Sequence, residues 1–508
     1  MGDSSNLFSV AQQKDAADPK QAARHFHLGC KLAKAGEHQK AIEELRQAAR
    51  LAPTQANYRY QLGLSLQALR QFPAAAAVYR GCVEISPKMA DAWSNLGVAL
   101  SESCDCNGAI ACFLRVQQLK PASAEGFFNA GVCYASLWEH GKAVEQLSKA
   151  ISLRPSMSAA YIWRGKSLHV LGDMREAINS YRKALSYDPA SAEAHWGLSL
   201  AHLMLGEYAE GWKEYEWRWR WAQFPSARRN FSQPQWSGEP LEGRSILLHA
   251  EQGFGDTLQF VRYAPLVAAA GGRVILEVQP ELFALLRDYP GVAQCVQSGE
   301  ALPRFDLHCP LMSLPLAFAT TAESIPAAVP IRLQVAESLQ ASEADELRVG
   351  LVWAGNKIHQ WNGQRSLGLT QFAPLWRLAG AVRFVSLQKG QAAAQRIESQ
   401  LPFAMEDGVA TAKDFADTAA VIAGLDLVIT VDTAVAHLAG SMGKPVWILI
   451  PESPDWRWGL TGESTPWYPT ARLFRATRSG GWPELMAQVA AELEKRCNQR
   501  SEVATREF

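Results

Sequence analysis

Two short segments of this 508-residue sequence carry residues whose types and spacing could do chemistry. The first, residues 251–257, reads Glu-Gln-Gly-Phe-Gly-Asp-Thr. Gly253 and Gly255 would let the backbone approach a ligand closely at the start of a helix. Asp256 would lie in the first helical turn, where its charge repels a pyrophosphate but suits a base that takes a proton from an acceptor hydroxyl. A dinucleotide-binding fingerprint is not predicted, because Leu258 stands where a third glycine is required.

The second segment, residues 430–440, reads Thr-Val-Asp-Thr-Ala-Val-Ala-His-Leu-Ala-Gly. We expect Asp432 to cap a helix, and the N–H groups of Thr433 and Ala434 to form an anion site together with the helix dipole. His437 lies one turn into that helix, where it could reach a diphosphate or a leaving group. A lone histidine is also a common core residue, but the position at the edge of a predicted sheet favours a functional role.

Both segments fall between a predicted strand and a predicted helix. From residue 245 onward, short apolar runs alternate with helical stretches, which predicts parallel sheets covered by helices. The predicted strands are 245–249, 273–278, 348–353, 382–387, 425–430 and 445–450. Ligands of such sheets bind beyond the carboxyl ends of the strands, where both segments would lie. The Pro-rich and then acidic stretch 326–346 predicts a hinge between two such halves.

The first half of the sequence repeats every 34 residues. Proline recurs at this spacing, at positions 53, 87, 121, 155 and 189. Glycine recurs in the same phase at 29, 63, 97, 131 and 165, followed twelve residues later by alanine and sixteen later by Leu, Tyr or Phe. Glycine allows two helices to approach, the large side chain fills the space between them, and proline ends the second helix.

This pattern resembles the tetratricopeptide repeat, with five clear units and a divergent sixth at about 192–222. Such helix pairs stack into an array with a groove that holds a peptide or protein segment. Asn95 and Asn129 occupy the same repeat position. In repeats like those of O-GlcNAc transferase, asparagine at this position faces the groove and binds peptide backbone. Two solvated polar residues are the alternative interpretation.

Five of the seventeen tryptophans lie between residues 212 and 236. The stretch 212–221 predicts a helix with aromatic side chains on two faces, which is typical of a helix buried on two sides. We interpret it as a joint between the array and the next domain.

The 251–257 and 430–440 segments together resemble the heptosyltransferase-type (family 9) glycosyltransferases of the GT-B fold, over about 245–495. The resemblance implies that Asp256 is the catalytic base and that Asp432, Thr433, Ala434 and His437 bind the diphosphate of a nucleotide-sugar. Repeats fused to such a module resemble O-GlcNAc transferase in overall plan, and bacterial tetratricopeptide-repeat glycosyltransferases most of all.

The donor-binding lysine of that family has no single counterpart here. In the loop 354–368, Asn356, Lys357, Arg365 and Ser366 are candidates, and Arg365 is preferred because its fork matches phosphate oxygens. Gln388 and Lys389 form a second candidate pair. The aromatic residues of 455–458 could stack on a base, although core packing explains them equally well. We expect no metal and no other cofactor, because the helix dipole and basic groups neutralise the leaving diphosphate in this fold.

Composition narrows the class of protein. Fifty Lys and Arg balance fifty Asp and Glu, so no overall field recruits nucleic acid or an anionic membrane. The sequence contains no run of about 18 apolar residues, so we expect no membrane span. The start of the sequence lacks the features of a secretion signal. The nine cysteines show no zinc-type spacing and predict free thiols in a reducing compartment, hence a cytoplasmic protein.

The sequence thus predicts an α-solenoid of tetratricopeptide repeats followed by an α/β GT-B module of two Rossmann-like halves. The expected parts are a tail at 1–21, the array at 22–222, a linker at 223–244, an acceptor-side half at 245–335, a nucleotide-sugar-binding half at 346–496 and a tail at 497–508. The predicted function is an inverting glycosyltransferase whose array presents a protein or peptide acceptor. The alternative is a non-catalytic adaptor with a degenerate transferase half, while a sugar epimerase would not need the array. The sugar, the base and the acceptor stay open.

Overall fold

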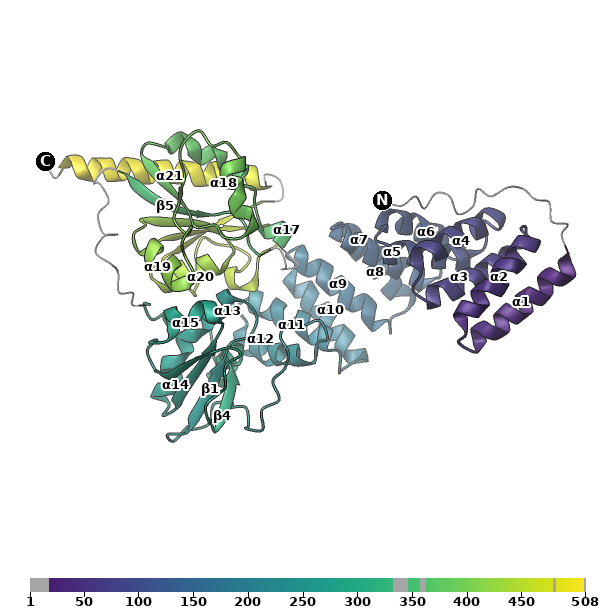
Figure 1. Ribbon diagram of the computed structural model, residues 1–508, viewed down its shortest axis with the longest axis horizontal. Coiled ribbons are helices and arrows are strands. Elements are labelled where there is room, and N and C mark those ends of the chain that lie inside the picture. The colour runs from purple at the N-terminus through teal and green to yellow at the C-terminus, as the bar shows by residue number, and fades with distance from the viewer. Residues whose placement is uncertain (1–17, 332–345, 357–361, 478–480, 507–508) are drawn as a thin grey trace. The chain divides into compact units, whose positions relative to one another are not determined.

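The computed structural model describes residues 18–331, 346–356, 362–477 and 481–506. The chain divides into two compact units between Ala194 and His195. The first unit is helical and the second contains the two parallel sheets (Figure 1). Within the described ranges, no helix is both long enough and apolar enough to cross a membrane.

The first unit consists of antiparallel helix pairs, as the 34-residue period predicts. The helices are α1 (Pro19–Lys34), α2 (His38–Leu51), α3 (Ala56–Ala68), α4 (Phe72–Ile85), α5 (Ala90–Glu102), α6 (Cys106–Leu119), α7 (Ala124–Ser136), α8 (His140–Leu153), α9 (Ser158–Val170) and α10 (Met174–Tyr187). Each repeat proline lies two residues beyond the end of a second helix, and the residue before it leaves the helical conformation, as Ala52 does at ψ 72°. Asp18 caps α1 through the backbone N–H groups of Lys20 and Gln21, so the first repeat begins at Pro19 rather than at 22.

The repeat glycines let the two helices of each pair touch. A Cβ atom at Gly63 would lie 2.4 Å from the ring of Tyr79, and one at Gly97 would lie 2.6 Å from the ring of Phe113. Gly29, Gly131 and Gly165 meet the side chains sixteen residues later in the same way. The predicted pairing of a glycine with a large side chain is therefore confirmed.

Helices α11 (Ala192–Met204) and α12 (Tyr208–Tyr215) form one more pair, which the chain division assigns almost entirely to the second unit. The predicted helix over 212–221 ends at Tyr215, and a 3-10 segment, η2 (Glu216–Arg220), follows it. Trp212 is buried against Phe260 and Trp456, at ring-centroid distances of 5.9 and 5.3 Å. The aromatic helix therefore packs on both α/β halves of its own unit.

The first sheet is parallel, with strand order β3-β2-β1-β4. Its strands are β1 (Ser245–His249), β2 (Arg273–Val278), β3 (Val292–Gln297) and β4 (Leu307–Pro310). Its connecting helices are α13 (Phe254–Phe260), α14 (Ala264–Ala269), α15 (Pro280–Leu286) and α16 (Leu314–Ala317), with short 3-10 segments η3 (Val261–Tyr263) and η4 (Leu311–Ser313). On one face of this sheet, the neighbours are irregular segments instead of helices. Leu247 and Ile275 on one face pack against Phe231, Leu302 and Phe305, which belong to irregular segments.

The linker 223–244 is attached to this sheet. Gln235 forms a parallel bridge with His308 on β4, in which Trp236 N–H donates to the His308 carbonyl at 2.8 Å and His308 N–H donates to the Pro234 carbonyl at 3.1 Å. Residues 234–236 therefore cover the outer edge of β4.

The second sheet is also parallel, in the order β10-β9-β8-β5-β6-β7, which is a Rossmann-like arrangement. Its strands are β5 (Leu347–Val352), β6 (Val382–Ser386), β7 (Glu406–Asp407), β8 (Leu427–Val431), β9 (Val446–Ile450) and β10 (Ala471–Arg475). The helical segments are α17 (Asn362–Arg365), η6 (Leu369–Leu378), η7 (Gln391–Ala394), α18 (Gln395–Glu398), α19 (Phe415–Ala423), α20 (Ala434–Ser441), η8 (Trp456–Trp458) and α21 (Gly481–Arg506). The expected C-terminal tail is helical instead, since α21 runs on to Arg506 and buries Cys497 in the core of this half.

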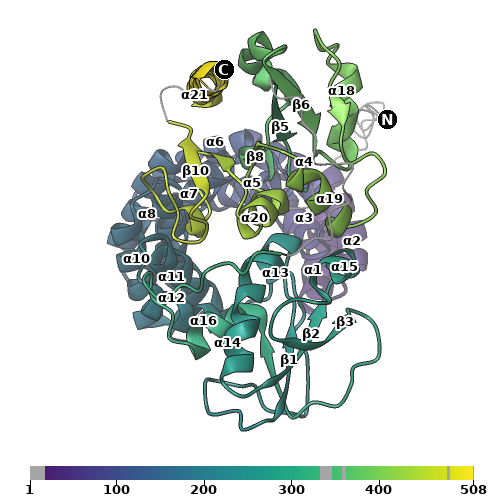
Figure 2. The same cartoon turned by 90° about the vertical axis from the view of Figure 1, so that its left-hand side faces the viewer.

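The two halves meet through α13 and α20, which lie side by side (Figure 2). The Ser441 hydroxyl donates to the Leu258 carbonyl across this contact at 3.4 Å. Helix α13 starts just after β1, and α20 starts just after β8. The contact therefore brings together the two segments in which the sequence places the chemistry.

Candidate active site between the two α/β halves

Asp256 fixes its own loop at the start of α13. Its Oδ2 accepts a hydrogen bond from the N–H of Gly253, the residue before the helix, at 2.9 Å. Its Oδ1 forms an ion pair with Nη2 of Arg457, which belongs to the other half. Burial raises the pKa of the Asp256 carboxyl, and Arg457 opposes this increase. The carboxylate is thus held between the halves, with a partner on each oxygen.

Gly255 lies against His437, so the two predicted segments touch each other here. A Cβ at Gly255 would be 2.7 Å from Cδ2 of His437 and 3.2 Å from its Nε2. Nδ1 of His437 is hydrogen-bonded to the Tyr468 hydroxyl at 2.9 Å, and the ring stacks on Trp458 at 5.4 Å. Packing encloses most of the ring, which is only 5% exposed, and the contact of His437 with a diphosphate or leaving group stays a prediction.

The surroundings of His437 favour its neutral imidazole. Burial holds its pKa well below the usual range, and the nearby guanidinium groups of Arg457, Arg262 and Arg365 lower it further. A neutral ring can donate or accept one hydrogen bond through Nε2, but it offers no positive charge to a phosphate.

Thr433, not Asp432, is the N-cap residue of α20. Thr433 has the extended conformation that precedes a helix, and its own side chain accepts no hydrogen bond from the first N–H groups of α20. Its hydroxyl lies 3.1 Å from that of Thr430. The predicted cap at Asp432 is wrong by one residue, because the helix begins at Ala434. The Ala436 N–H already donates to the Thr433 carbonyl at 3.0 Å, and the binding of an anion by the N–H groups of Thr433 and Ala434 stays a prediction.

Charged groups from two other segments act on Asp432, namely Arg365 after β5 and the pair Asp455 and Arg457 after β9. Burial raises the pKa of its carboxyl and Asp455 raises it further, whereas Arg365 and Arg457 lower it. Two arginines therefore flank the start of α20, although only Arg365 was a predicted donor-binding residue.

The loop after β5 is shaped by residues that were predicted to bind the donor. The Gln388 amide accepts from the N–H groups of Trp353 and Ala354 at 3.0 and 2.9 Å, and donates to the carbonyls of Ala354 and Lys389, both at 3.0 Å. These four bonds use the whole capacity of the amide. Gln388 is therefore a support for the loop rather than a donor-binding group.

The remaining candidates in this region differ in what they can offer. Ser366 accepts from the Gly355 N–H at 3.0 Å and supports the same loop. Lys389 is exposed and bonds to the Ala412 carbonyl. Arg365 lies over Gly355, and its buried Nε has no hydrogen-bond partner among the described residues. Asn356 is exposed at the end of the described loop, and Lys357 lies outside the described residues.

Arg457 is a site residue that the sequence analysis missed. Besides Asp256, it contacts Asp455 at 2.9 Å and the side-chain oxygen of Gln259 at 2.5 Å. Within 455–458, only the aromatic residues carried a predicted role. Trp456 and Trp458 are buried in the core, so the proposed stacking on a base is not available to them.

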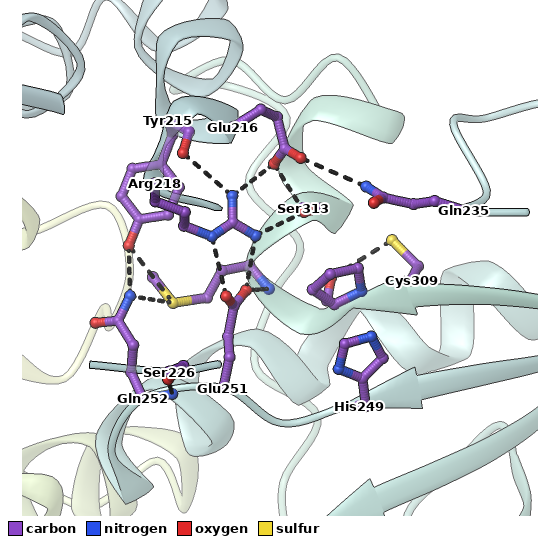
Figure 3. A network of polar contacts seen from close by, with 12 residues as sticks. Tyr215, Glu216, Arg218, Ser226, Gln235, His249, Glu251, Gln252, Cys309 and Ser313 are labelled. Carbon is purple, nitrogen blue, oxygen red and sulfur yellow. Dashed lines mark hydrogen bonds and ion pairs between the residues drawn. The ribbon is translucent and has the colours of Figure 1, made fainter. Parts of the chain in front are cut away.

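Arg218 is the second missed residue (Figure 3). Its fully buried guanidinium donates from Nε and Nη2 to the two oxygens of Glu251, both at 2.9 Å, and from Nη2 to the Ser313 hydroxyl at 2.8 Å. Glu251 begins the loop that leads to Asp256. The 3-10 segment after α12 therefore anchors that loop, and the arginines within the Trp-Arg-Trp-Arg-Trp run were the available signal.

Two cavities of about 190 and 260 Å³ adjoin the first sheet and share Trp219, Arg229 and His249 in their walls. Burial, reinforced by His308 and Arg229, lowers the pKa of His249 to about 3. Glu277 on β2 is buried in an ion pair with Arg229. Arg229 is thus paired with Glu277, and His249 lies 3.4 Å from Nδ1 of His308 through its Nε2.

In the helical unit, Asn95 donates to the Tyr60 hydroxyl at 3.1 Å, and Asn129 is half-buried at the equivalent place on α7. Asn95 is therefore partly engaged within the array. In the part of the chain that the structure describes, no three His, Cys, Asp or Glu side chains come together in a way that could hold a metal ion.

Comparison with known families matches both parts of the chain. Residues 60–103 match the tetratricopeptide repeat and residues 165–206 match the TPR repeat. Residues 378–486 match glycosyltransferase family 9 (heptosyltransferase).

Individual relatives are more distant. Protein FlbA of Caulobacter vibrioides is 29% identical over 324 residues, which are 57% of this chain and 53% of that protein. The chain thus spans about half the length of this curated relative. Among solved structures, MamA is 24% identical with a TM-score of 0.33, covering 34% of this chain and 95% of its own. Pseudomonas aeruginosa PilF is 19% identical with a TM-score of 0.34, covering 40% of this chain and 90% of its own.

The family matches agree with the helix pairs of the first unit and with the Rossmann-like second sheet. Tetratricopeptide repeats thus make up the N-terminal part of the chain, and its C-terminal part contains a glycosyltransferase family 9 (heptosyltransferase) domain.

Proposed function

We propose that this protein is an inverting glycosyltransferase of the GT-B type that moves a sugar from a nucleotide-sugar to a protein or peptide acceptor. The observation that carries the proposal is the contact of α13 with α20, where Gly255 lies against His437. This contact brings the carboxylate of Asp256, whose side chain is only 18% exposed, close to a helix start whose N-cap side chain makes no capping hydrogen bond. A base and an anion site are the two elements that the reaction needs.

In the proposed reaction, the diphosphate of the donor lies at the start of α20, where the N–H groups of Thr433 and Ala434 and the side chain of Arg365 neutralise its charge. Asp256 accepts the proton of an acceptor hydroxyl. The hydroxyl oxygen forms a new bond to the anomeric carbon from the side opposite the diphosphate. The bond from that carbon to the diphosphate oxygen breaks, and the nucleoside diphosphate leaves with the electron pair. We include no metal, because arginines and the helix dipole supply the positive charge.

The array is the proposed acceptor-binding part, through Asn95 and Asn129. Its two asparagines lie on the first helices of consecutive repeats, where amide groups suit the backbone of an extended peptide. We place the reaction in the cytoplasm, which the nine free cysteines support.

A non-catalytic adaptor is the second candidate. It is favoured by one observation, namely that both oxygens of Asp256 already have partners. An adaptor would bind a protein through the array and would turn over no donor.

The deciding experiment measures nucleotide release from UDP-, GDP-, ADP- and CMP-sugars by the purified full chain, with and without candidate protein acceptors. Release from one class of donor supports the transferase. The Asp432→Ala/His437→Ala variant should lose donor binding in calorimetry while its circular dichroism stays unchanged. Unchanged affinity would show that the donor does not bind at the start of α20. No release from any donor, together with intact protein binding, would favour the adaptor.

A further inference from the structure

Arg457 is shared between acids of the two halves. Its Nη2 pairs with Asp256 of the first half, and its Nη1 contacts Oδ1 of Asp455 in its own half at 2.9 Å. Nε is directed to Oε1 of Gln259 on α13. The side chain is only 9% exposed, so these partners account for the guanidinium's charge with little help from water. A buried guanidinium needs anionic partners. A new anion can therefore bind Arg457 only if it replaces one of the two carboxylates.

The surroundings of Arg457 include the start of α20. The positive charge of Arg457 lowers the pKa values of both Asp432 and His437, so it acts directly on the place where the donor's diphosphate is proposed to lie. Arg365, in the segment that follows β5, lowers the pKa values of the same two groups. Arg365 has an unpartnered Nε among the described residues, whereas Arg457 is engaged with Asp256.

We propose that Arg457 is a positioning residue that exchanges partners, pairing with Asp256 in the donor-free protein and with the donor's diphosphate when the donor is bound. This inference rests on the proposed function and adds a form of regulation to it. While Arg457 contacts the carboxylate, it favours the ionised form and weakens Asp256 as a base. When Arg457 pairs with the diphosphate, Asp256 keeps its largely enclosed position, with 18% of the side chain exposed, but loses the cation, so its affinity for a proton rises. The base becomes effective only when there is a sugar to transfer.

The exchange can be tested without any turnover, because the Asp256 carboxylate and the diphosphate compete for the same arginine, Arg457. Inorganic pyrophosphate is the probe, and calorimetry on the full chain gives its affinity for the wild type, Asp256→Asn, Arg457→Gln and the double variant. Asp256→Asn frees Arg457 and should strengthen pyrophosphate binding by about tenfold or more, since close charge pairs couple at this level or above. In the Arg457→Gln background the same substitution should change the affinity by less than about twofold.

This cycle separates the exchange from a plain electrostatic field. If Asp256 only repels the anion, its removal strengthens binding by the same factor whether or not Arg457 is present, and that result overturns the inference. The absence of pyrophosphate binding in the wild type and in Asp256→Asn also overturns it. Arg457→Met keeps most of the buried stem and provides the same cycle if Arg457→Gln does not fold. Arg472→Gln, which removes an arginine paired with Glu463 and Glu492, is the control and should behave as the wild type.

A second readout uses the pH dependence of turnover. The profile of kcat/KM for the donor reports the base in the free enzyme, and that of kcat reports it in the complex. The wild type should show a higher apparent pKa in kcat than in kcat/KM, and Arg457→Gln should show no such difference. Equal values in the wild type would overturn the exchange. If no donor is turned over, the proposed function fails while calorimetry still decides the exchange. If turnover occurs and the cycle is additive, only the exchange fails.

Discussion

A Cβ atom at Gly255 would lie 2.7 Å from Cδ2 of His437, so the two α/β halves touch at a position that only glycine fits. Gly253, two residues earlier in the same loop, has far more room, since the nearest atom to its Cβ would be Oδ2 of Asp256 at 3.4 Å. The contact between the halves thus requires glycine at position 255 but not at position 253. This difference gives a matched pair of variants.

We predict that Gly255→Ala lowers the free energy of unfolding by about 1–3 kcal/mol, as overpacking does, and reduces turnover by displacing Asp256 from α20. Gly253→Ala should change either quantity little. Denaturant unfolding and initial rates of both variants test this. Similar losses in the two variants would show that the loop, and not the contact with His437, is sensitive.

Replacement of Asp256 tests the base directly. Asp256→Asn keeps the shape of the side chain but cannot take the proton, so turnover should fall by a factor on the order of 10²–10⁴ without loss of donor affinity. Asp455→Asn, which removes the other acid on Arg457, is the control and should lose much less. Steady-state kinetics with calorimetry of the donor provides the comparison. An Asp256→Asn enzyme with nearly full turnover would exclude this residue as the base.

The Arg218 network makes a prediction about stability. Arg218→Met leaves Glu251 buried without its partner, which should lower the free energy of unfolding of the α/β unit by about 3–5 kcal/mol. Arg218→Met/Glu251→Gln removes the uncompensated charge and should recover part of that loss. Urea unfolding of both variants measures the difference. A double variant that is no more stable than the single one would mean that lost packing, and not the buried charge, dominates.

Buried histidine makes the second unit sensitive to acid. The pKa of His249 is about 3 in the folded protein and about 6.5 when unfolded. Its contribution to stability is therefore complete above pH 6.5 and is lost as the pH falls toward 3. Between pH 7 and pH 5 this loss is about 2 kcal/mol. His249→Gln should reduce the decrease in melting temperature between these two pH values, whereas His27→Gln, at an exposed position on α1, should not.

The groove of the array can be tested by point changes. Asn95→Ala/Asn129→Ala removes two amides, each worth roughly 0.5–1.5 kcal/mol if it binds peptide backbone, so use of a protein acceptor should weaken by one to two orders of magnitude at most. Tyr60→Phe breaks the bond to Asn95 but keeps both amides, and should leave acceptor use unchanged. Initial rates against acceptor concentration, beside donor hydrolysis by water, measure the effect. Equal loss in both assays would mean that the asparagines support the fold.

Much of the fold follows from periodicity in the sequence. The spacing of 34 predicts which glycine meets which large side chain, because both belong to one local helix pair. Six strands follow from aliphatic runs, and all six are present within two residues of the prediction. The four missed strands, β3, β4, β7 and β10, are the edge strands of the two sheets. An edge strand has a neighbour on one side only, so its sequence is shorter or more polar, as in Val-Ala-Gln-Cys-Val-Gln of β3.

The candidate site was predictable only in part. Asp256 and the start of α20 could be placed because strand-to-helix loops lie at the carboxyl edge of a parallel sheet. Arg457 and Asp256 are 201 residues apart, and no local pattern reports which arginine will cross between two halves. Gln388 shows the opposite case. It lies at the carboxyl edge of the sheet, as predicted for a donor-binding residue, but its amide is bonded to the backbone of its own half.

The bridge between Gln235 and His308 has a consequence for how this protein behaves among its own copies. A strand at the rim of a sheet presents unpaired backbone groups, which can template the addition of a strand from another molecule. At β4 those groups are already bonded to residues 234–236. The segment that joins the aromatic helix to the first sheet is therefore also a guard against self-association. The linker must therefore be long enough to reach β4, because a linker that did not pair with this strand would leave its backbone groups free to bind a strand of another molecule.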